Sequence, residues 1–182
     1  MAVILPKQIG TQQGKLLFQK SVKVEDFDQG RKIINSLEET LEHYGGVGLA
    51  APQVGIPKRL FVINILPTKD HPQLPKIGFR AYLNPEILET SSETNYDIEG
   101  CLSILYGTFY GQVQRASYAK IKYLDIDGKE KTEEITNPFY ARVVLHEIDH
   151  LNGKIFLQRM KLKDFSELFW DENFDVRKKD LK

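Results

Sequence analysis

Cysteine and net charge are what this sequence lacks most clearly. Its 182 residues include one cysteine, Cys101, which cannot form an intramolecular disulfide and therefore favours a reducing compartment. The 25 lysine and arginine residues balance 25 aspartate and glutamate residues, so the formal net charge at pH 7 is +0. This balance gives no reason to expect a nucleic-acid partner or binding to an acidic membrane surface.

Long hydrophobic runs and targeting features are also missing. The first residues, from Met1 to Lys7, lack a basic region, and their apolar run is too short for a secretion signal or a membrane span. There is no internal repeat, long linker or low-complexity tract. The sequence therefore predicts a soluble cytoplasmic protein with one domain over residues 1–182, long enough to bury about 70% of the surface of the unfolded chain.

Two helices are predicted from apolar residues at helical spacing. The first starts near residue 25, with Asp26 or Asp28 as its N-cap, and ends at Gly45. The second follows an N-cap at Asn137 and ends before Gly153. Both carry an apolar stripe, which indicates that they pack against a core.

Short β-strands are expected in the middle of the chain. Residues 58–65 are apolar and β-branched, which is typical of a buried strand, and residues 118–135 form a hairpin around an Asp-Gly turn. Residues 82–88 are expected to form a strand, a turn and a second strand, because Pro85 restricts this segment to a sheet edge or to a break in a strand. The ends of the chain are expected to form an extended arm over residues 1–20 and a short final helix over residues 165–170.

Within the second predicted helix, His146 and His150 flank Glu147 in the pattern H-E-x-x-H. In a helix the two histidines differ by about 40° around the axis and about 6 Å along it, so both imidazoles can reach one cation. Glu147 then lies beside the cation and can accept a proton from its water molecule. A histidine pair on the surface of an amphipathic helix needs no metal, so the pattern alone leaves both interpretations open.

Cys101 lies in a short strand-like run, residues 99–103 (EGCLS). A thiolate is the third ligand that the histidine pair lacks, and three protein ligands leave a fourth position open to water, as in catalytic zinc sites. A lone cysteine is more commonly a small buried apolar residue. Alone, Cys101 therefore does not decide between these two interpretations.

Residues 46–53 (GVGLAAPQ) are rich in small side chains. They formally match a dinucleotide-binding fingerprint, but a Rossmann turn follows a strand and opens a helix, whereas this segment follows a helix and contains Pro52. Small residues would allow a peptide to add itself to an exposed strand edge here, with Gln53 offering an amide donor beside it. A helix C-cap followed by a turn would explain the same glycines.

Taken together, residues 46–53, 99–103 and 146–150 (HEIDH) resemble, in order and spacing, the three signature motifs of the peptide deformylase family. The similarity extends from the first predicted helix to Met160. The resemblance implies an α+β fold with antiparallel β-sheets packed around a central metal-bearing helix. It also implies a metal-dependent hydrolase that removes the N-formyl group from formylmethionine at the start of nascent polypeptides and releases formate.

The resemblance assigns roles to residues of this sequence. The metal ligands would be Cys101, His146 and His150. Water made acidic by the metal would attack the formyl carbon, while Glu147 takes a proton and later delivers it to the departing amine. The Gln53 side-chain amide and the Leu102 backbone N–H would stabilise the oxyanion, by about 2.7 to 4 kcal/mol per donor.

The resemblance also implies ligands and partners. The metal in cells would be Fe2+, although imidazole and thiolate ligands also accept Zn2+, Ni2+ or Co2+. The N-formylmethionyl peptide would lie as an added strand near Gly46, Val47 and Gly48, with Val143 as an apolar wall for its methionine side chain. The ribosome is an expected partner, whereas neither direct contact with nucleic acid nor a membrane is expected.

Some positions depart from the pattern of the family. Leu145 stands where a glutamine is common before the first histidine, which removes a polar side chain near the metal ligands. The loop between Ser103 and Arg115 is two residues longer than usual, which leaves the substrate preference open. The first 20 residues lack the usual proline-rich opening, so their role is open as well.

Two other functions are compatible with parts of the sequence. A zinc endopeptidase would use the same H-E-x-x-H pair, but the metzincin frame requires histidine at position 156 and finds Phe156. A downstream acid, Glu167 or Glu172, would be the third ligand of another protease type. A deformylase-like binding module without activity would hold a structural metal only, and the presence of Glu147 and Gln53 argues against it.

Overall fold

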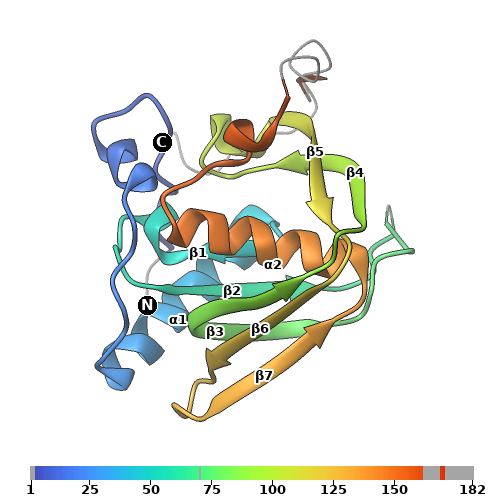
Figure 1. Cartoon of the computed structure of the whole chain (residues 1–182). Coiled ribbons are helices and arrows are strands. Elements are labelled where there is room, and N and C mark those ends of the chain that lie inside the picture. The colour runs from blue at the N-terminus through green and yellow to red at the C-terminus, as the bar shows by residue number, and fades with distance from the viewer. Residues whose placement is uncertain (1–2, 70, 162–168, 171–182) are drawn as a thin grey trace.

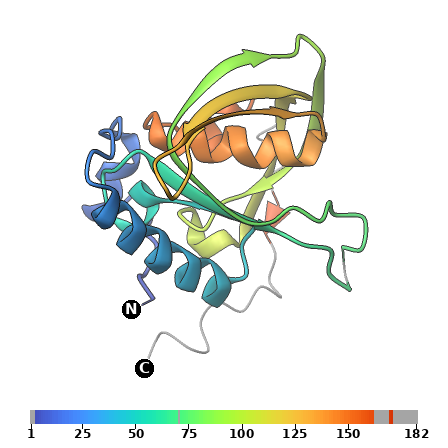
Figure 2. The same ribbon diagram turned by 90° about the horizontal axis from the view of Figure 1, so that it is seen from below.

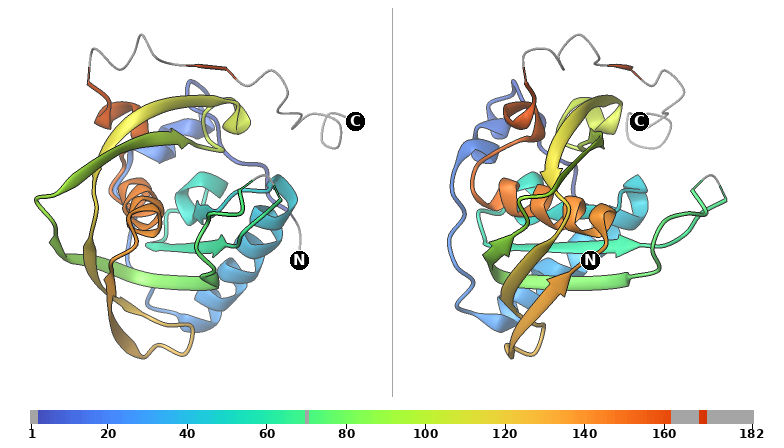
Figure 3. Two further views of the ribbon diagram at one scale, coloured as in Figure 1. Left: turned by 90° about the vertical axis from the view of Figure 1, so that its right-hand side faces the viewer. Right: turned by 45° about the vertical axis from the view of Figure 1, so that its right-hand side comes forward.

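Two antiparallel β-sheets enclose the helix α2 (Pro138–Leu151) in the computed structural model, which describes residues 3–69, 71–161 and 169–170 (Figure 1). The larger sheet has the order β1 (Gly48–Ala50), β2 (Leu60–Ile65), β3 (Gly78–Thr90), β6 (Ala119–Leu124) and β7 (Glu130–Ile135). The smaller sheet has the order β4 (Thr94–Gly100), β5 (Phe109–Ala116) and β8 (Phe169–Trp170). The predicted α+β fold is therefore confirmed, and Figure 3 shows α2 end-on between the sheets.

β2 is the strand that the sequence indicated as buried, and its side chains alternate between two cores. Phe61, Ile63 and Ile65 pack into the cluster that α2 completes, whereas Leu60 and Val62 point to the opposite face. The helix α1 (Phe27–Tyr44) covers this opposite face, as Figure 2 shows. The larger sheet is thus covered by α1 on one face and by α2 on the other.

α1 begins and ends as its sequence predicts. Asp26 is the N-cap, and its carboxylate accepts hydrogen bonds from the backbone of Asp28 at 2.9 Å and of Gln29 at 3.0 Å. The helix ends at Gly45, whose φ of 74° lies in the left-handed region that glycine adopts without strain. Of the two predicted N-caps, Asp26 is confirmed, and Asp28 lies in the first turn.

The two sheets are connected at one corner of the molecule. The chain passes from β3 into β4 through residues 91–93 and returns from β5 into β6 through residues 117–118. Ser91 N donates to Tyr118 O at 3.2 Å and Ser117 N donates to Glu93 O at 3.0 Å, so the paired strands continue through the bend. This path brings Cys101, which directly follows β4, back to the face of α2.

Three predictions about longer segments are wrong. Residues 1–20 are not extended throughout, because the 3-10 helix η1 (Gln13–Phe18) lies within them and is preceded by a turn in which Thr11 Oγ1 accepts from Gly14 N at 3.0 Å. β3 is one continuous strand with neighbours on both sides, and Pro85 is accommodated between register shifts. Phe169 and Trp170 form the strand β8 instead of a helix, and residues 165 and 168 lie outside the described residues.

The position of Cys101 also differs from the expectation. Cys101 was expected inside a strand-like run, but it lies in the turn after β4, which is followed by the 3-10 helix η3 (Leu105–Gly107). Among the described residues, no helix is long and apolar enough to cross a membrane.

Candidate metal centre

Cys101, His146 and His150 come together although they are separated in the sequence. The ligand atoms of the three residues all lie within 4.8 Å of one another, and Cys101 Sγ is 3.2 Å from His150 Nε2. All three side chains are buried. A thiolate and two imidazoles are the donor set of three-ligand catalytic sites, so the side chains present fit a divalent cation with one position left open.

The histidines face the interior because α2 has no solvent face near them. Every residue from Tyr140 to Leu151 is buried. A helix that is buried all round packs on several sides, here against the larger sheet and against β5. The interpretation of the histidine pair as solvated helix surface is therefore wrong.

Glu147 places a carboxylate beside these ligands. Its side chain is 3% exposed, and its Oε2 atom has no hydrogen-bond partner among the described residues. Burial raises the pKa of the Glu147 carboxyl to about 7. A buried carboxyl that changes protonation state near neutral pH is suited to accept and return a proton.

Gly48 is required by the position of this carboxylate. A Cβ atom added at Gly48 would lie 2.5 Å from Glu147 Oε1 and 3.0 Å from the Glu147 carboxyl carbon. No such contact is tolerated without a shift of one of the two groups. Gly48 in β1 thus lets the edge of the larger sheet approach the carboxylate of α2.

Gln53 is buried and held in one orientation by the backbone. It lies in the 3-10 helix η2 (Ala51–Val54), and its Oε1 atom accepts from Ala50 N at 2.7 Å. Its Nε2 atom then points at Cys101 Sγ, 3.4 Å away. Because the oxygen is fixed by Ala50, the amide presents its hydrogen-bond donor to the centre.

The other predicted site residues fall into two groups. Leu102 follows Cys101 and is buried, and a Cβ added at Gly46 would lie 3.4 Å from Leu102 Cδ1. Val143 is buried in the core cluster on the α2 side of the larger sheet, and Val47 packs against that cluster. Val47 directly precedes β1, which residues 48–50 form and which is an edge strand of the larger sheet.

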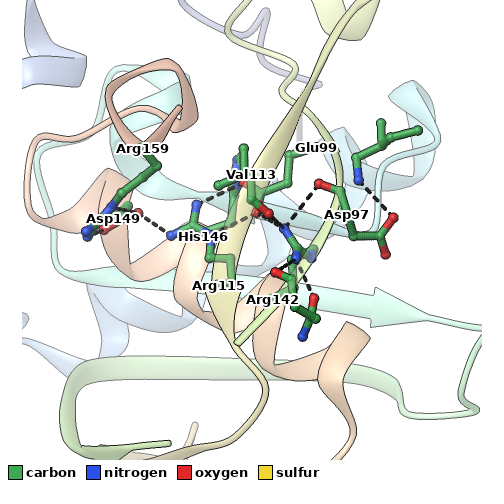
Figure 4. A network of polar contacts seen from close by, with 10 residues as sticks. Asp97, Glu99, Val113, Arg115, Arg142, His146, Asp149 and Arg159 are labelled. Atoms are coloured by element: carbon green, nitrogen blue, oxygen red, sulfur yellow. Dashed lines mark hydrogen bonds and ion pairs between the residues drawn. The ribbon is translucent and has the colours of Figure 1, made fainter. Parts of the chain in front are cut away.

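A network of buried charges supports His146, and the sequence did not single it out (Figure 4). His146 Nδ1 lies 2.8 Å from Glu99 Oε2, so it can donate its proton there and leave Nε2 unprotonated for a cation. Glu99 also accepts from Arg115 Nε and Nη2 at 2.8 and 2.9 Å and from Arg142 Nη1 at 2.8 Å. Burial raises the pKa of Glu99, but the hydrogen bonds from Arg115 and His146 outweigh it and hold the pKa well below its ordinary value.

The network continues to the end of α2. Arg115 Nη1 donates to Asp149 Oδ2 at 2.5 Å, and Arg159 Nη2 donates to Asp149 Oδ1 at 2.5 Å. Four charged residues of this network are buried, namely Glu99, Arg115, Arg142 and Asp149. Each of them has a hydrogen-bonded partner of opposite charge, which offsets the cost of burying it. One sequence signal existed: Arg142 stands one helical turn before His146, on the same face of α2.

The protease alternative finds no third ligand in the position that its frame requires. The ring of Phe156 is buried with its centroid 6.2 Å from that of His146, and a phenyl ring cannot bind a cation as a ligand atom does. Among the described residues, the group that completes a cluster of three ligands is Cys101. Glu167 and Glu172 lie outside the described residues.

Comparison with known proteins gives a consistent result. The family model for polypeptide deformylase matches residues 6–166. A peptide deformylase from Thermotoga neapolitana is 39% identical over 147 residues, which covers 80% of this chain and 82% of that protein. Peptide deformylase 1 from Clostridium acetobutylicum is 44% identical over 147 residues, which covers 80% of this chain and 89% of that protein.

Solved structures agree with the sequence comparison. A class I type b peptide deformylase from Acinetobacter baumannii, bound to Met-Ala-Ser, superimposes with a TM-score of 0.80 and 34% identity, covering 87% of this chain and 99% of that one. A peptide deformylase from Thermotoga maritima superimposes with a TM-score of 0.76 and 35% identity, covering 88% of this chain and 99% of that one.

Proposed function

The chain belongs to the peptide deformylase family of metal-dependent hydrolases, which remove the formyl group from nascent polypeptides, and we propose that it performs this hydrolysis at the centre between α2 and the end of β4. The observation that carries the proposal is the meeting of three metal-ligand side chains with a buried carboxylate that lacks a partner among the described residues. A structural metal site would have four protein ligands and no need of such a carboxylate.

The metal ligands are proposed to be Cys101, His146 and His150. A divalent cation bound there would make a water molecule more acidic and polarise the formyl oxygen. Glu147 would accept a proton as water attacks the formyl carbon and would deliver it to the amine nitrogen as the C–N bond breaks. The raised pKa of Glu147 supports both halves of this transfer, because a group with a pKa of about 7 is readily protonated and deprotonated at neutral pH.

Two donors are proposed to stabilise the oxyanion that forms on the formyl carbonyl. The Gln53 side-chain amide is oriented by Ala50 N and points at the centre. The backbone N–H of Leu102 belongs to the residue that directly follows the proposed ligand Cys101. Donors fixed before the reaction stabilise developing negative charge without reorganisation, at about 2.7 to 4 kcal/mol each.

The formylated peptide is proposed to bind along β1. One edge of β1 pairs with β2, and β1 ends the order of the larger sheet. A peptide can therefore add as a further strand near Gly46, Val47 and Gly48, with its methionine side chain beside Val143. The Met-Ala-Ser bound to the Acinetobacter baumannii relative has the sequence expected of a deformylated product, which supports this substrate class.

The setting of the reaction is also part of the proposal. We propose Fe2+ as the ion in cells, as expected from the family, with Zn2+, Ni2+ or Co2+ able to occupy the same ligands. The enzyme would act in the cytoplasm on chains that emerge from the ribosome, as one catalytic domain over residues 1–182. Determining the bound metal together with the activity of protein purified without oxygen tests the choice of ion.

Formate release from formyl-Met-Ala-Ser tests the function directly. Protein purified without oxygen and loaded with iron, nickel or cobalt is expected to release formate. Absence of turnover with all three ions would refute the enzymatic function. In the same assay, Cys101→Ser is expected to lose metal, whereas Glu167→Ala and Glu172→Ala are expected to keep it; the opposite pattern would support a zinc endopeptidase.

A further inference from the structure

Residues near the start of the chain form hydrogen bonds with both segments that carry the proposed oxyanion donors. Lys7 N donates to Gln53 O at 2.6 Å, and Ile9 N donates to Ser103 O at 3.0 Å. These two bonds connect η2, which carries Gln53, to the turn that follows Cys101. The residue between them, Gln8, contacts the turn with its side chain.

Every polar atom of the Gln8 side chain is used. Its Nε2 atom donates to Leu102 O at 2.8 Å and to Pro6 O at 3.1 Å. Its Oε1 atom accepts from Tyr106 N at 3.1 Å. One amide thus holds both ends of the segment from Leu102 to Tyr106, as a backbone pairing would.

The segment that Gln8 holds is strained. Leu105 and Tyr106 have φ angles of 47° and 55°, in the left-handed region that residues other than glycine rarely adopt. Two such residues in succession persist only where the surrounding structure holds them. The bond from Tyr106 N to Gln8 is one contact that does so.

The backbone around Gln8 is itself fixed. Pro6 is buried, and Ile9 packs against the cluster that contains Cys101. Thr11 Oγ1 donates to Gln8 O at 2.8 Å, and a Cβ added at Gly14 would lie 1.9 Å from that same oxygen. Gln8 therefore acts from a rigid support, which is the requirement for a residue that orients another group.

We propose that Gln8 is a positioning residue for deformylation, which orients the backbone of Leu102 so that its N–H meets the oxyanion. This inference rests on the proposed function. The hydrogen bond to Leu102 O fixes the peptide group after Leu102, and the bond from Ile9 fixes the next carbonyl. The peptide group that carries the Leu102 N–H lies between Cys101 and Leu102, and its carbonyl, Cys101 O, accepts from Ile104 N at 2.9 Å. The turn is therefore held on both sides of the Leu102 N–H.

The test compares three variants of the full-length, metal-loaded protein with formyl-Met-Ala-Ser. Gln8→Ala removes all three hydrogen bonds of the side chain. Gln8→Glu keeps the size and the acceptor for Tyr106 N but loses the donor to Leu102 O. Gln12→Ala is the matched control, because Gln12 lies on the same arm, is exposed and, as the N-cap of η1, makes no side-chain hydrogen bond to the start of that helix. The readouts are kcat, KM, bound metal and the pH profile of kcat.

Gln8→Ala and Gln8→Glu are expected to lower kcat by roughly tenfold to a hundredfold, since misplacement of a reacting group by about 1 Å has an effect of this size. In both variants KM is expected to change by less than about twofold, and bound metal and the pH profile of kcat are expected to stay as in the wild type. Gln12→Ala is expected to match the wild type in all four readouts.

An unchanged kcat in Gln8→Glu would overturn the inference, as would a loss that follows loss of metal or a rise of KM. If Gln8→Ala does not fold, Gln8→Glu decides. Absence of turnover in the wild-type protein would instead refute the proposed function, so the two failures are distinguishable.

Discussion

The surroundings of the Glu147 carboxylate are more easily explained by catalysis than by a structural role. It is buried beside two histidines, one of its oxygens has no partner among the described residues, and Gly48 is packed against the other. A carboxylate left in this state for structural reasons alone would be destabilising, because burial of a charge without compensation costs several kcal/mol. The surroundings of Glu147 therefore support a role in proton transfer.

Glu147→Gln is expected to keep bound metal and to lower turnover of formyl-Met-Ala-Ser by roughly 10²- to 10⁴-fold, the range for loss of a general acid or base. The amide has the same size but cannot accept the proton. Metal content and formate release measured on the same sample check this. Retention of more than about a tenth of wild-type turnover would contradict the role.

Gly48→Ala is expected to displace the Glu147 carboxylate, because the new Cβ would lie 2.5 Å from Oε1. The expected result is a fall in kcat of roughly tenfold or more with metal bound as in the wild type. Formate release and metal analysis test it. An alanine at this position with wild-type kcat would show that the carboxylate can move without consequence.

The helix α2 is the element that combines the chemistry with the core. It is buried on all sides near the histidines, so its polar side chains need partners from other elements. Glu99 at the end of β4 and Arg115 at the end of β5 supply them, and Arg142 within α2 itself adds a third charge. The smaller sheet thus serves to orient His146.

Glu99→Gln is expected to destabilise the protein by about 3 to 5 kcal/mol, because Arg115 and Arg142 would lose a buried counter-charge. Metal affinity is expected to fall roughly 10- to 100-fold as His146 loses its orienting partner. Glu93→Gln, directly before the same strand and exposed, is the control and is expected to change stability by less than about 0.5 kcal/mol. Urea unfolding and metal titration would decide; equal effects of both variants would contradict the role of Glu99.

At the scale of the whole molecule, acid is expected to weaken the contact between the smaller sheet and α2. Burial raises the pKa of Asp149, but the hydrogen bond from Arg159 and the charge of Arg115 outweigh it, so the net pKa is lowered, as it is for Glu99. A carboxyl with a lowered pKa in the folded state adds stability that is fully present above its unfolded pKa of about 4. This stability is lost as pH falls through the lower folded value.

The stability that Glu99 and Asp149 contribute is therefore expected to be constant above about pH 5 and to fall below about pH 4. Urea unfolding of metal-free protein at pH 7, 5 and 3 measures this without a contribution from metal release. Glu99→Gln should show a flatter fall between pH 5 and pH 3. An equally steep fall in this variant would show that the network does not cause the acid sensitivity.

Several features of this protein are determined by sequence alone, because they depend on local geometry. The extent of α1 follows from helical spacing, from Asp26 as N-cap and from Gly45 at its end. The pairing of His146 with His150 follows from the pitch of a helix. The family resemblance joined these histidines to Cys101, and the structure brings the three side chains together. The roles of these residues in catalysis stay predictions.

Other features were decided only by the tertiary structure, because they depend on contacts between distant residues. Glu99 meets Arg115 across 16 residues and Arg142 across 43, and no local pattern reports such a meeting. Pro85 is tolerated inside β3 because shifts of register relieve it of strand pairing. Gln8 reaches Leu102 across 94 residues, so the function of the first residues of the chain becomes visible only when the fold brings them to the centre.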